Sequence, residues 1–128
     1  MKKLFCKDAI LAEAAVTAET FSLRLMGMSW RKKWPSRDGF DIDAYIFPEC
    51  SAVHTFFMFI CVDVIFLDSS DKIVKVIHSM PPWRIAAGGK DAVCTVELPA
   101  GTLKMKNVNV GDILTAQDQH AVILPPIA

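Results

Sequence analysis

The sequence predicts a mainly β fold, an antiparallel sandwich or barrel of short strands with one short helix. Apolar and polar residues alternate over residues 40–46, as they do in a half-exposed strand. Residues 62–67 are β-branched or aromatic, and the polar turn at 68–71 leads into a second apolar run at 73–77, which predicts a local antiparallel hairpin. Six or more such short strands favour two packed layers or a closed sheet.

The other elements follow from local signals. Residues 10–16 fit either a strand or the start of a helix. Thr17 is a candidate N-cap, and the spacing of Phe21, Leu25 and Met28 then predicts a short helix that ends before Pro35.

Further along the chain, residues 92–98 alternate as a strand does. Residues 99–101 open a turn or a short helix. The turn at 110–112 precedes a final strand at 113–116.

Length and charge bound the functional classes. The 128 residues are 52% hydrophobic, which is enough for one domain, residues 1–128, with its own core. Fourteen basic side chains balance fourteen acidic ones, so no long-range field draws in nucleic acid or an anionic membrane. We therefore expect neither as a partner.

The cysteines and the apolar stretches predict a cytoplasmic protein. The four cysteines show no C-x-x-C pair and no disulfide-scaffold density, so reduced thiols are expected. Residues 1–12 do not read as a signal peptide. The most apolar stretch, residues 52–67, is shorter than the roughly 20 residues of a membrane-spanning helix.

Residues 48–68 join soft or titratable side chains to a buried strand. Cys50, His54 and Met58 are spaced by four residues and are soft ligands that suit copper. A copper site also needs a second histidine from elsewhere, so we favour core or turn roles for all three and predict no metal and no cofactor.

Two other assignments in this segment stay open. Cys50 and His54 are candidates for a nucleophile and its base, with Asp63 as the orienting group. The alternative is that His54 and Thr55 hydrogen-bond a tight turn.

Asp63 lies inside an apolar strand, so it requires a partner, for which Arg24, Arg31 and Arg84 are candidates. Such a pair either shapes a ligand pocket or fixes a loop, and we favour the structural role.

Two aromatic and cationic clusters are further candidates. The stretch from Trp30 to Trp34 interleaves tryptophan with Arg31 and two lysines, a pattern that suits phosphate or nucleic-acid binding but is more typical of a solvated helix end. The segment 81–84 presents Trp83 and Arg84 on a rigid turn, either as a pocket rim or as a loop clamp.

Together these residues resemble one family, the uncharacterised domain of unknown function 192, over about residues 15–114. Each matching piece is weak alone, but their order and spacing are specific. The pieces are R-L-M-G-M at 24–28 with Arg31 after it, C-x-x-x-H-T at 50–55, Met58, D-V-I-F-L-D at 63–68, P-W-R at 82–84, V-E-L-P-A-G at 96–101 and V-G-D at 110–112.

The resemblance implies a β-sandwich of jelly-roll-like character with one short helix. It implies no reaction, cofactor or catalytic residue, because the family has none established. Phe57 and Phe59 stand where members commonly carry a glycine and a basic residue. This departure either makes any shared pocket more apolar or leaves Asp63 dependent on an arginine elsewhere.

The sequence thus favours a non-catalytic module that binds a small ligand or a partner protein. An enzyme that uses Cys50 or His54 is the second hypothesis, and a structural protein that self-associates through its phenylalanine-rich segment is the third. The candidate pocket comprises Arg24, Arg31, Cys50, His54, Thr55, Met58, Asp63, Trp83 and Arg84.

Overall fold

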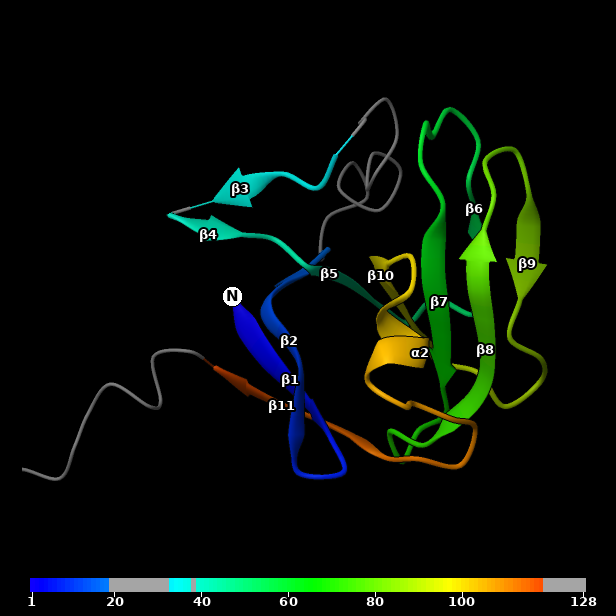
Figure 1. The fold of residues 1–128 in the computed structure, drawn as a ribbon. Helices are drawn as coiled ribbons and strands as arrows, with labels where there is room; N and C mark the ends of the chain where they lie inside the picture. The colour runs from blue at the N-terminus through cyan, green and yellow to red at the C-terminus, as the bar shows by residue number, and fades with distance from the viewer. Residues whose placement is uncertain (19–32, 38, 119–128) are drawn as a thin grey trace, which may run out of the picture.

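A curved seven-stranded sheet forms the body of the protein in the computed structural model, which describes residues 1–18, 33–37 and 39–118 (Figure 1). The strand order is β11-β1-β2-β5-β10-β7-β8. All neighbours run antiparallel except β2 and β5. The strands are β1 (Lys2–Cys6), β2 (Ala9–Thr17), β5 (Ala44–Pro48), β7 (Val62–Leu67), β8 (Ile73–Met80), β10 (Cys94–Pro99) and β11 (Leu114–Asp118).

Smaller elements complete the described part of the chain. A ribbon of β3 (Ser36–Arg37) and β4 (Phe40–Asp41) stands apart from the sheet in Figure 1, and β6 (Ala52–His54) pairs with β9 (Ile85–Ala87). The helix α2 (Thr102–Met105) follows β10. The sheet does not close into a barrel, although an isolated bridge between Lys72 and Ile113 joins its two edges at one point.

The predicted mainly β fold with one short helix is confirmed within the described residues, as is the hairpin of β7 and β8. Residues 10–16 form a strand. The strand predicted over residues 40–46 is instead split into β4 and β5, because Asp43 turns its carboxylate onto the amides of Glu13 and Ala14, at 2.8 and 2.9 Å. The helix expected after Thr17 lies outside the described residues.

The two faces of the sheet bury separate apolar clusters. All six residues of β7 are buried, and alternation sends Ile65 and Leu67 to one face and Val64 and Phe66 to the other. The first face packs with Leu103 of α2. Because both faces are covered, the polar side chains of the central strands are buried as well.

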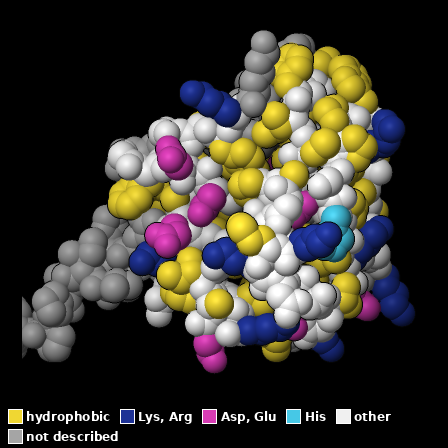
Figure 2. Space-filling view, viewed as in Figure 1, with side chains coloured by type: hydrophobic (Ala, Val, Ile, Leu, Met, Phe, Trp, Pro, Cys, Tyr) yellow, Lys and Arg dark blue, Asp and Glu magenta, His cyan; other side chains and the backbone are white. Residues whose placement is uncertain are grey.

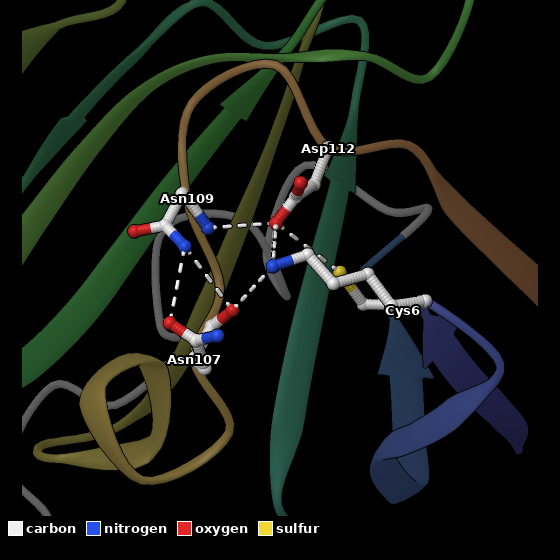
Figure 3. A network of polar contacts seen from close by, with 5 residues as sticks. Cys6, Asn107, Asn109 and Asp112 are labelled. Carbon is white, nitrogen blue, oxygen red and sulfur yellow. Dashed lines mark hydrogen bonds and ion pairs between the residues drawn. The ribbon is translucent and has the colours of Figure 1, made fainter.

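A polar network ties the turn between β1 and β2 to the loop before β11 (Figure 3). The Lys7 ammonium lies 3.2 Å from an Asp112 carboxylate oxygen and donates to the Asn107 carbonyl at 2.9 Å. The backbone amide of Asn109 donates to the same carboxylate at 2.9 Å, and this bond is the main reason that the pKa of Asp112 is lowered. Burial raises the pKa of the neighbouring Cys6 thiol, which favours its protonated form.

Gly88 lets the β6–β9 pair lie close over the sheet. A Cβ atom at this position would come within 2.5 Å of the Phe66 ring and 2.6 Å of Ala92. Both neighbours are buried core residues, so neither can move aside cheaply.

We therefore expect Gly88→Ala to lower the free energy of unfolding by about 1 to 3 kcal/mol through overpacking. Urea denaturation measures the change, and Lys90→Ala on the exposed surface of the same loop is the control. A Gly88→Ala protein as stable as the wild type would show that the β6–β9 layer is not closely seated on Phe66.

Candidate functional site at the aromatic end of the sheet

A buried threonine joins the two loops at one end of the sheet. Thr55 has no exposed surface, and its hydroxyl donates to the Pro81 carbonyl at 2.6 Å and accepts from the Arg84 amide at 2.9 Å. Its backbone amide donates to the Arg84 carbonyl, and its carbonyl accepts from the Trp83 amide, at 2.8 and 2.9 Å. The loop after β6 and the loop before β9 are thus held as one unit, which Figure 1 shows at one end of the sheet.

Two aromatic residues on these loops adopt an unusual backbone conformation. Phe57 and Trp83 have φ angles of 64° and 63°, in the left-handed region that bulky residues rarely occupy. Their rings meet edge to face with centroids 4.9 Å apart, yet the residues remain 43% and 57% exposed. Backbone strain that presents large apolar side chains to solvent is a feature of functional sites.

The aromatic contacts continue toward the strand. Phe56 lies 5.7 Å from Trp83 between ring centroids, and His54 stacks on Phe56 at 5.1 Å. The His54 Nδ1 atom accepts the Phe56 amide at 3.3 Å. We call the group of His54, Phe56, Phe57, Trp83 and Arg84 the aromatic end.

Neighbouring apolar side chains enlarge this surface. Phe59, on the loop after β6, is 53% exposed, and Ile85, the first residue of β9, is 70% exposed. In Figure 2 hydrophobic side chains gather at the upper right, where these loops lie in the matching ribbon view. Met58, by contrast, is buried and donates its amide to the Thr55 carbonyl, so it anchors the loop rather than lining a surface.

The candidate nucleophile and base do not meet. The Cys50 thiol donates to the Ala52 carbonyl at 3.1 Å, whereas His54 hydrogen-bonds the Phe56 amide at the other end of β6. Within the described residues, no three His, Cys, Asp or Glu side chains gather as they would around a metal ion. Of the alternatives for His54 and Thr55, the hydrogen-bonded turn is the one that these contacts match.

Asp63 lies on the face of the sheet that packs with α2, and it has no arginine partner among the described residues. Its fully buried carboxylate accepts the amides of Ser79, Gly101 and Leu103 at 2.8, 3.0 and 2.9 Å. Arg84, one of the three candidate partners, does not pair with Asp63, because backbone amides bond the carboxylate and the exposed Arg84 guanidinium contacts the Trp83 carbonyl. Arg24 and Arg31 lie outside the described residues.

A second buried carboxylate, which our sequence analysis did not single out, is Glu97 of β10. It is 4% exposed and lies between Tyr45 of β5 and Val64 of β7 in the register of the sheet. Burial alone raises the pKa of Glu97 to about 7. Asp63 stood out in the sequence because it is a charged residue inside an apolar strand. The same criterion, applied to the V-E-L-P stretch, identifies Glu97.

The family model of the domain of unknown function 192, described as an uncharacterised ACR, matches residues 6–116. The chain is a DUF192 protein. This confirms the family resemblance noted in the sequence.

Curated relatives of this DUF192 chain carry the name UPF0127 protein. One from Pyrococcus abyssi is 44% identical over 62 residues, which are 48% of this chain and 52% of that protein. One from Thermococcus sibiricus is 32% identical over 79 residues, or 60% and 51%. The chain spans about half the length of these relatives.

Two solved structures share the fold. A protein of unknown function from Novosphingobium aromaticivorans gives a TM-score of 0.71 at 14% identity, covering 89% of this DUF192 chain and 82% of that one. A putative transcription regulator from Sinorhizobium meliloti gives 0.70 at 18% identity, covering 91% and 94%. Likenesses at these identities establish the fold alone.

Among the described residues, no helix has the length and apolar character needed to span a membrane.

Removing the Asp63 carboxylate leaves three backbone amides without their acceptor, that of Leu103 in a buried position. We expect Asp63→Ala to cost about 3 to 5 kcal/mol of unfolding free energy. Asp91→Ala, which removes an exposed carboxylate, should change it by less than about 0.5 kcal/mol. Chemical denaturation measures both, and a loss below about 1 kcal/mol for Asp63→Ala would contradict the structural role assigned to this carboxylate.

Glu97 makes stability depend on pH. The folded chain keeps the Glu97 proton up to about pH 7, whereas the unfolded chain releases it near the ordinary value of 4.5. This share of the stability is therefore complete below about pH 4.5 and is lost as pH rises through about 7, a fall of about 3 kcal/mol.

Glu97→Gln should remove that fall, so the variant should exceed the wild type in stability at about pH 8. Urea denaturation from about pH 4 to pH 9 gives the difference curve between the two proteins. Parallel pH profiles would show that the Glu97 carboxyl titrates normally.

Proposed function

We propose that this DUF192 protein is a non-catalytic binding module that takes a protein partner through the aromatic end. The observation that carries the proposal is the Phe57–Trp83 pair. Two half-exposed aromatic rings are held edge to face on left-handed backbone by the buried Thr55. Folding alone does not require large apolar side chains to be presented to solvent in this way.

The residue types support an interface. Tryptophan and arginine are the types that most often dominate the binding energy of protein interfaces, and phenylalanine is enriched there. Trp83 and Arg84 are adjacent, exposed and fixed by backbone hydrogen bonds to Thr55. Because these loops are ordered by the chain's own contacts, binding would cost little conformational entropy.

The shape of the surface favours a protein over a small molecule. Small-ligand sites are concave and bury most of the ligand, whereas Phe57, Phe59, Trp83 and Ile85 are each at least 43% exposed. An apolar side chain of a partner would pack between such rings. A cytoplasmic setting is part of the proposal, because all four cysteines are free thiols.

The catalytic alternative receives no comparable support. Cys50 and His54 each hydrogen-bond a different backbone group, and burial raises the pKa of the nearby Cys94 thiol to about 11. In these contacts the candidate nucleophile Cys50 has no base beside it.

Photo-crosslinking tests the proposal in cells. A benzoylphenylalanine at Phe59 places the reactive group beside the aromatic end, and the same residue at Ile113 is the control. Ile113 is 55% exposed and lies at the opposite end of the sheet, beside the start of β8. We expect one protein adduct at position 59 that position 113 does not give.

The captured protein must then bind in purified form. Trp83→Ala should weaken that binding by about tenfold or more, and Ile113→Ala should leave it unchanged. Equal binding by both variants would overturn the proposal. Capture of a second copy of this chain would replace it with self-association through the same surface.

A further inference from the structure

Glu97 occupies the centre of an otherwise apolar face. Directly opposed residues in neighbouring strands point to the same side of a sheet, so Val16, Tyr45, Glu97 and Val64 form one row across β2, β5, β10 and β7. The three neighbours in that row belong to the buried apolar cluster of this face. Glu97 is the charged member of the row.

The Glu97 carboxyl has no partner in the described part of the chain. Burial is the single cause of its raised pKa, with no hydrogen bond or neighbouring charge contributing. No fully enclosed side-chain oxygen of the described residues lacks a hydrogen-bond partner, and Glu97 keeps 4% of its surface exposed. The carboxyl therefore sits at the margin of the buried region, where a small group can reach it.

Aromatic rings flank this carboxyl. Tyr45 lies directly opposite Glu97 in the register, and the half-buried Trp34 stacks on Tyr45 with ring centroids 5.6 Å apart. Phe47, two pairs further along the same strands, lies 6.2 Å from Tyr45 between ring centroids. Aromatic faces attract cations, and most strongly where water is excluded.

We propose that Glu97 and the Trp34–Tyr45 ring pair form a binding site for the ammonium group of an organic cation. The carboxylate supplies the countercharge, and the rings supply apolar walls that suit a weakly hydrated or methylated ammonium. A divalent metal ion does not fit this chemistry, because it would find one carboxylate where several oxygen ligands are needed. The proposal does not depend on the aromatic end.

This assignment accounts for the cost of Glu97. An ionised, buried carboxylate without a partner destabilises the fold, and an aliphatic residue in this strand would not. A bound ammonium would restore the missing charge and hydrogen bonds. Binding should then release the Glu97 proton, so affinity should rise with pH.

Nuclear magnetic resonance with defined cations tests the site. Methylammonium and tetramethylammonium chlorides are titrated into the full chain at about pH 8, with sodium chloride at equal ionic strength as the reference. We expect saturable shifts of the Trp34 indole and Glu97 carboxyl signals with the organic cations and none with sodium. At about pH 5.5 the affinity should be lower, because the carboxyl is then protonated.

Matched variants separate this site from general charge effects. Glu97→Gln should weaken binding by about tenfold or more, and Trp34→Leu by about threefold to tenfold. Glu49→Gln removes an exposed carboxylate and should change nothing. Because Glu97→Gln should gain stability, loss of folding is not expected to obscure the result.

Two results would overturn the proposal. Shifts of equal size and affinity in Glu97→Gln would place the cation elsewhere on the protein. A Glu97 carboxyl that titrates below its ordinary value of 4.5 would show that a cation of this chain already holds it.

Discussion

The Asp63 carboxylate is the interaction on which the arrangement of both ends of the sheet depends. It joins β7 to Ser79 near the end of β8 and to Gly101 and Leu103 at the start of α2. Ser79 has a φ angle of 49°, so the same contact holds β8 in a strained conformation just before the chain enters the loop that carries Trp83. Three charge-assisted hydrogen bonds are strong enough to hold such strain.

Thr55 continues this organisation at the aromatic end. Asp63 sets the direction in which β8 leaves the sheet. The Thr55 hydroxyl then holds the following loop by donating to the Pro81 carbonyl and accepting from the Arg84 amide. Neither Thr55 nor Asp63 touches solvent, yet together they determine how Phe57 and Trp83 are presented to it. The exposed surface is thus a product of buried polar contacts, and small changes at Thr55 should be felt across the whole aromatic end.

Sequence patterns could predict the hairpin of β7 and β8 because its partners are close in the chain and its residues are β-branched and aromatic. They could not predict β6 and β9, whose three-residue pairing is fixed by tertiary contacts through Thr55. The residue type of Asp63 was informative, but its partners were not, since they are backbone amides 16, 38 and 40 residues away. Backbone amides carry no side-chain signature, so the candidate partners that the sequence offered were arginines. The cluster of Thr55, Trp83 and Arg84 required the fold to bring two loops together.

The contrast between Asp63 and Glu97 separates structure from function in this chain. Both carboxylates are almost completely buried on central strands, and they point to opposite faces. Asp63 is saturated by amides, so its charge contributes to folding. Glu97 has only burial acting on it, so its charge opposes folding. The fold itself satisfies the Asp63 carboxylate, whereas it leaves the Glu97 carboxyl uncompensated, which is the charge that the proposed cation would balance. Both side chains are buried carboxyl groups, and their hydrogen bonds are what distinguishes them.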